Sequence, residues 1–116
     1  MITSFRKRQK RVAGRGGMHN YIVNLINSKN IDAEMMKNEA LHLQETLENL
    51  RINGVISNDA YLDAGSIEGG LSMLANLIEL GIPHEEVEEH LRQLLVRAGR
   101  IDEAHPTLGT AVADSR

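Results

Sequence analysis

Apolar side chains recur every three or four residues along most of the chain after residue 17, which is the period of an amphipathic helix. The first such segment begins at residue 18 and ends in the polar turn that starts at Asn27. Its apolar positions are Met18, Tyr21, Ile22, Leu25 and Ile26. The second segment, 33–53, alternates four-residue and three-residue steps between Met36, Ala40, Leu43, Leu47 and Leu50. Because this is the spacing of a seam between packed helices, we expect a helix in each segment, with Asp32 as the N-cap of the second and Gly54 after its end.

The helical period continues after Ile56, with Ser57 and Asn58 available as N-cap residues. The apolar positions of this third segment are Ala60, Tyr61, Ala64, Ile67, Leu71, Leu74, Ala75 and Ile78. Glycines interrupt it at positions 65, 69 and 70, and each costs about 0.5–1 kcal/mol relative to alanine in a helix interior. The sequence leaves two alternatives open: the helix breaks near Gly65-Ser66, or the glycines let another backbone come close.

A fourth helix is predicted after Gly81 and Pro83, which end the third. Its apolar stripe consists of Val87, Leu91, Leu94, Leu95 and Ala98. Glutamates near its start and arginines near its end agree with the helix dipole. Residues 101–116 contain Pro106, Gly109 and few large apolar groups, so they are expected to form a C-terminal tail. The prediction is an all-α domain over 18–100, with four helices, or five if the third breaks.

Composition narrows the class of protein without naming a reaction. The chain has 116 residues, 41% of them hydrophobic but only 3% aromatic, which favours helices packed through aliphatic side chains. The absence of cysteine excludes disulfides, thiolate metal sites and a cysteine nucleophile. No apolar run approaches the ~18–20 residues of a membrane span, and we expect no membrane partner.

Charge is strongly segregated along the chain. Residues 1–17, here called the basic arm, carry six cations and no acid, whereas residues 18–116 carry seven basic and sixteen acidic side chains, a formal −9. The six cations are Arg6, Lys7, Arg8, Lys10, Arg11 and Arg15. With no face to bury, the arm is expected to be flexible in isolation and to contact nucleic-acid phosphates. Two alternatives stay open: a solubilising tail, and a segment that binds an acidic protein or membrane surface.

The corner around Gly81 is similar to a DNA-reading helix-turn-helix in its spacing, but its chemistry argues against that function. The second helix would present Glu85, Glu86, Glu88 and Glu89 to the phosphates. These carboxylates would be repelled by a polyanion. We therefore interpret the segment as a structural helical corner whose acidic face is solvated or docks a basic protein partner.

No catalytic motif is present. The five histidines, His19, His42, His84, His90 and His105, show no metal-ligand spacing. There is no nucleophile elbow, Walker loop or dinucleotide fingerprint. We expect no enzymatic activity, no metal and no cofactor. The apolar runs 71–80 and 94–96 exceed one narrow stripe, which favours a homo-oligomer or a groove for a partner.

The sequence thus predicts a non-enzymatic, oligomeric binding protein whose basic arm contacts nucleic acid. Such a chain would suit a phage or mobile-element component, located in the cytoplasm of the producing or host cell or within a virion. One alternative is an inhibitor or adaptor that docks through its acidic fourth helix. Another is a small ligand-binding helical bundle.

Overall fold

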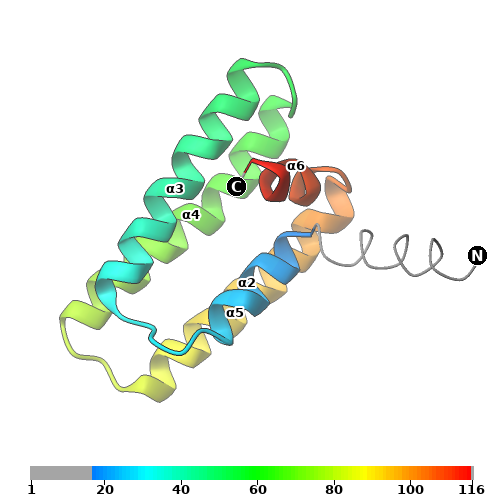
Figure 1. Ribbon diagram of the computed structural model, residues 1–116. Coiled ribbons are helices and arrows are strands. Elements are labelled where there is room, and N and C mark those ends of the chain that lie inside the picture. Colours follow the sequence, from blue (N-terminus) through cyan, green and yellow to red (C-terminus); the bar gives the residue numbers. More distant parts are fainter. Residues whose placement is uncertain (1–16, 116) are drawn as a thin grey trace, which may run out of the picture.

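The computed structural model describes residues 17–115, and all regular structure in that range is helical. The five helices are α2 (Met18–Ile26), α3 (Ala33–Ile52), α4 (Asn58–Glu79), α5 (His84–Ala104) and α6 (Leu108–Asp114) (Figure 1). The predicted all-α class is confirmed for this part of the chain. The predictions for the basic arm before Gly17 lie outside the described residues.

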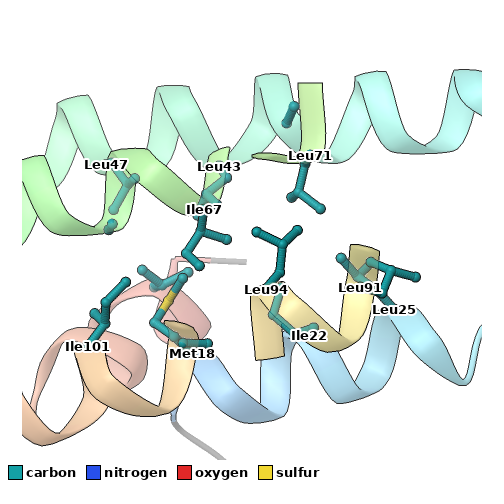
Figure 2. Close-up of a cluster of buried hydrophobic side chains, with 14 of the residues drawn as sticks. Met18, Ile22, Leu25, Leu43, Leu47, Ile67, Leu71, Leu91, Leu94 and Ile101 are labelled. Carbon is teal, nitrogen blue, oxygen red and sulfur yellow. The ribbon is translucent and has the colours of Figure 1, made fainter. Parts of the chain in front are cut away.

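The helices form two packed layers. Helices α3 and α4 make a long hairpin, and α2 lies along α5 in the second layer (Figure 1). Figure 2 shows the core side chains projecting from both layers into the space between them. Most buried apolar residues belong to the predicted stripes, among them Met36, Leu43, Leu47, Ile67, Leu71 and Leu91, whereas Ile101, Leu108 and Val112 lie in the segment predicted as a tail. The helical periods read from the sequence therefore identify most of the core.

The helix ends also follow the predicted local chemistry. The Asp32 carboxylate accepts a 2.8 Å hydrogen bond from the Met35 N–H, and the Ser57 hydroxyl accepts one of 3.0 Å from the Ala60 N–H. At the other ends, Gly54 has φ +75° and Gly81 has φ +90°. This left-handed conformation is the one that glycine adopts without strain.

Both glycines belong to complete Schellman motifs. After α3, the Val55 N–H donates to the Leu50 carbonyl at 2.9 Å, and the Gly54 N–H donates to the Arg51 carbonyl at 3.0 Å. After α4, the N–H groups of Ile82 and Gly81 donate to the carbonyls of Leu77 and Ile78 at 3.3 Å and 2.9 Å respectively. The carbonyls at each helix end are thereby satisfied, and the chain turns sharply into the next helix.

The structure resolves the open question about the third predicted helix. Helix α4 runs unbroken from Asn58 to Glu79, across all three glycines. A Cβ on Gly70 would lie 2.6 Å from Cδ2 of Leu94, so this glycine lets α5 approach closely. A Cβ on Gly65 or Gly69 would meet nothing within 4 Å. Of the three glycines, only Gly70 makes room for a neighbour, and that neighbour is a side chain rather than the backbone that the sequence-based interpretation named.

The expectation of a tail over 101–116 is wrong for most of that segment. Helix α5 continues to Ala104, with Ile101 buried, and residues Leu108–Asp114 form α6. Helix α6 buries Leu108 and Val112 and packs against α2 and α3. Pro106 separates two helices and does not end the fold. A seven-residue helix is too short to be stable alone, so its stability comes from this packing and was not evident in its own pattern.

Candidate binding surfaces

The basic arm ends at the start of α2, which is capped by a residue far away in the sequence. Gly17 is the N-cap of α2 and has no capping side chain of its own. The carboxylate of Asp102, near the end of α5, accepts hydrogen bonds from the N–H groups of Met18 at 2.7 Å and His19 at 3.0 Å. A Cβ on Gly17 would lie 2.6 Å from Asp102 Oδ2, so the close approach requires glycine there. This anchor fixes where the arm leaves the body.

The six predicted phosphate contacts, Arg6, Lys7, Arg8, Lys10, Arg11 and Arg15, lie outside the described residues. On the body, the arginines closest in sequence to the anchor are Arg97 and Arg100. Both are exposed on α5, within about two turns of Asp102, and neither forms an ion pair within residues 17–115. At 100° per residue, however, Arg97 and Arg100 lie about 140° and 160° around α5 from Asp102, on the other side of the helix from the anchor.

The predicted acidic docking residues lie at the opposite end of α5. Seventeen residues separate Glu85 from Asp102, or about 25 Å along the helix axis. Glu85, Glu86 and Glu89 are exposed and Glu88 is half-buried. Helical spacing makes Glu85 a neighbour of Glu88 and Glu89, and makes Glu86 a neighbour of Glu89. The four predicted residues thus share one broad side of α5, within a sector of about 160°.

Arg92 partly compensates this acidic group, and His84 lies beside it. Glu88 Oε2 lies 3.3 Å from His84 Nε2, and Glu88 Oε1 lies 3.8 Å from an Arg92 guanidinium nitrogen. Arg92 also lies 3.9 Å from Glu89. All of these side chains are 42% or more exposed, so each pair is worth little on its own. The acidic start of α5 is therefore a solvated charged surface with internal pairing.

A groove of about 320 Å³ lies between α2, α3 and α6, and sequence reasoning missed it. Its lining includes Met18, Tyr21, Leu25, Met35, Glu39 and Val112. The Tyr21 hydroxyl donates to Glu39 Oε1 at 2.9 Å. Because α6 forms one wall, the groove could not be found while residues 101–116 were interpreted as a tail. Its lining is mixed, and it brings together no pair of groups suited to acid–base chemistry besides Tyr21 and Glu39.

The histidines do not converge. His105 Nε2 lies 2.8 Å from Asp63 Oδ2 and ties the α5–α6 connection to α4. The two residues are 42 positions apart, so no local motif could reveal the contact. His42 Nε2 is buried without a hydrogen-bond partner. Within the described range, no group of three or more His, Asp or Glu side chains is arranged to hold a metal ion.

The apolar surplus expected from the sequence is visible on the surface. Met73 and Leu80 in the run 71–80, and Val96 in the run 94–96, are exposed. Leu41, Ile52, Val55 and Leu62 are exposed as well. Across residues 17–115, none of the helices combines the length and apolar character needed to cross a membrane.

Comparison with protein-family models, curated proteins and solved structures found no match for this chain. The argument for function therefore depends on the chain's own charges, surfaces and contacts.

Proposed function

We propose that this chain is a non-enzymatic nucleic-acid-binding protein: the basic arm neutralises phosphates, and the helical body anchors the arm and self-associates. The observation that carries the proposal is the segregation of charge. Six cations precede Gly17, whereas residues 17–115 hold six basic and sixteen acidic side chains. Because duplex binding depends on neutralising phosphates, the arm is the segment suited to a polyanion.

The body supports this function in two ways. The hydrogen bonds to Asp102 hold the root of the arm in a fixed position. The acidic start of α5 lies about 25 Å from that root along the helix. A ligand bound by the arm would therefore lie away from these glutamates, and the acidic surface would limit non-specific adsorption.

The test is the salt dependence of nucleic-acid binding by the full chain. Fluorescence anisotropy with a labelled DNA duplex and a labelled RNA should show an affinity that falls as salt rises. For the duplex, up to six phosphate contacts give a log–log slope of up to about −5, because each contact contributes roughly −0.9. Replacing Arg6, Lys7, Arg8, Lys10 and Arg11 with glutamine should flatten the slope. Binding should weaken to a similar degree for unrelated sequences, because phosphates carry no base identity.

A matched pair of variants separates the arm from a general effect of charge. Arg6→Gln/Lys7→Gln and Lys29→Gln/Arg92→Gln each remove two cations, but only the first pair lies in the arm. We expect the first double variant to reduce the slope by about 2 and the second to change it little. The proposal is overturned if the full chain shows no salt-dependent binding, or if a chain lacking residues 1–16 binds equally well.

A further inference from the structure

The outward face of α4 carries large apolar side chains that nothing in residues 17–115 covers. Leu62 is 61% exposed, Met73 is 52% exposed and Leu80, the C-cap residue, is 81% exposed. The leucines of the same helix that face the core, Leu71 and Leu74, are fully buried. Helix α4 is therefore apolar on two sides, and one of them has no partner within the described chain.

Two glycines lie on the same outward face and have no role in the packing of the described chain. A Cβ on Gly65 or Gly69 would meet no atom within 4 Å, in contrast to Gly70, which makes room for Leu94. Glycine destabilises a helix interior relative to alanine. Gly65 and Gly69 thus each destabilise α4, and no contact within the described part of a single copy explains why glycine stands there. In packed helices, a glycine without a Cβ lets a neighbouring chain come close to the helix.

These positions form a continuous, uncharged stripe. At 100° per residue, Leu62, Gly65, Gly69, Met73 and Leu80 fall within a sector of about 80°. The other α4 residues in that sector are Asn58 and Asn76, so the stripe contains no charged side chain. The acids of α4 lie on its flanks. Residues 17–115 hold six basic and sixteen acidic side chains, and an uncharged helix face within such an acidic surface favours a partner that binds through apolar contact.

We propose that this stripe is a self-complementary interface on which α4 packs antiparallel against α4 of a second copy. This rests on the self-association within the proposed function and names its surface. With the two-fold axis at the level of Leu71, Leu62 lies opposite Leu80 of the second copy. Met73 lies opposite Gly69 of the second copy. Large side chains then meet at the two ends, and in the middle each methionine fits over a glycine.

A two-fold arrangement of this kind forms a closed dimer. A two-fold interface uses the same patch on both copies, so it leaves no free apolar stripe for further growth. The stripe from Leu62 to Leu80 is about 27 Å long. Leu41 of α3, which is 53% exposed and lines a groove together with Asn76, extends it sideways. One helix face of this length is a small interface, and small interfaces are typically weak, so we expect a dissociation constant on the order of micromolar.

Sedimentation velocity of the full chain over a concentration series tests the inference. The wild type should shift from monomer to dimer, and added salt should leave the dimer unchanged or strengthen it, because two acidic bodies repel each other. Gly69→Leu fills space that is open in one copy and should weaken dimerisation at least ten-fold without loss of helical signal. Met73→Glu should do the same. Val96→Glu, at an exposed apolar site outside the stripe, is the matched control and should dimerise like the wild type.

The register can be tested by cross-linking, because the chain has no cysteine of its own. An oxidised mixture of a Leu62→Cys chain and a Leu80→Cys chain should form a disulfide heterodimer efficiently, whereas either chain alone should not. A wild-type dimer that is unaffected by Gly69→Leu and Met73→Glu would overturn this interface and leave self-association standing. A wild type that stays monomeric at all concentrations would overturn both. The anisotropy assay judges the arm independently of either result.

Discussion

Asp102 caps the helix that begins at Met18, 84 residues earlier in the chain. Its two carboxylate oxygens accept from the consecutive N–H groups of Met18 and His19, at 2.7 Å and 3.0 Å. Helix α2 thus receives from the end of α5 the capping group that its own N-cap residue lacks. The contact joins the two helices of one layer at the point where the arm leaves the body. We infer that it contributes both to folding and to the position of the arm.

Removing this carboxylate should destabilise the fold. Asp102→Ala leaves the part-buried N–H of Met18 and the exposed N–H of His19 without their acceptor, and loss of an N-cap side chain costs about 0.5–2 kcal/mol. Asp102→Asn keeps one acceptor oxygen and should cost less. Urea unfolding followed by circular dichroism measures both. Glu103→Ala, at the exposed neighbouring position, should stay within about 0.5 kcal/mol of the wild type. Equal effects at positions 102 and 103 would contradict the capping role.

Truncating the predicted core should have larger effects. Leu47 of α3 and Leu91 of α5 are buried in opposite layers. Leu47→Ala and Leu91→Ala should each lower the free energy of unfolding by roughly 2–5 kcal/mol, because each leaves a cavity that its neighbours fill only partly. The exposed Leu41 offers a matched control, and Leu41→Ala should cost far less. Losses below about 1 kcal/mol at both buried sites would mean that the helical faces are misassigned.

The α4 glycines should respond differently to alanine. Gly65→Ala adds a methyl group into open space and removes a glycine from a helix interior, so it should stabilise a single copy by about 0.5–1 kcal/mol. Gly70→Ala drives a methyl group to 2.6 Å from Leu94 Cδ2, and overpacking of this kind costs about 1–3 kcal/mol. Unfolding should be measured at concentrations where the protein is monomeric. A Gly70→Ala chain as stable as Gly65→Ala would mean that Leu94 moves aside freely.

The parts of the fold that were predictable from sequence are those decided by local chemistry. Helical periods located the core, Asp32 and Ser57 located two helix starts, and Gly54 and Gly81 located two ends. Helix α6 was not predictable, because only Leu108 and Val112 mark its buried side and its stability depends on packing against distant helices. The three α4 glycines are indistinguishable in sequence, and only the position of Leu94 separates Gly70 from the others.

The candidate surfaces likewise divide into those visible in the local sequence and those that depend on contacts between distant residues. The charge of the arm and the acidic start of α5 are visible in the sequence, because each is a run of neighbouring residues. The Asp102 anchor and the Asp63–His105 contact are not visible there, because each joins residues far apart in the chain. The α4 stripe was visible only as a surplus of apolar residues. Its outward direction depends on which side of α4 the core occupies.

The acidic start of α5 distinguishes the proposed function from the alternative in which that helix docks a protein. Replacing Glu85, Glu86, Glu88 and Glu89 with glutamine should leave the fold helical, because three of them are exposed and the fourth is half-buried. Nucleic-acid affinity should rise, since four repulsive charges are removed from the body, and the gain should shrink as salt increases. A matched variant neutralises the exposed acids Glu34, Glu45, Glu48 and Asp59 instead.

If the acids of the body act on nucleic acid only through their charge, both quadruple variants should raise the affinity in anisotropy titrations, and to a similar extent at low salt. The α5 variant should also dimerise like the wild type, because none of its four positions lies in the α4 stripe. A fall in nucleic-acid affinity confined to the α5 variant would contradict the proposal. It would mean that these glutamates organise the bound state through specific contacts, because removing repulsion alone cannot weaken the binding of a polyanion.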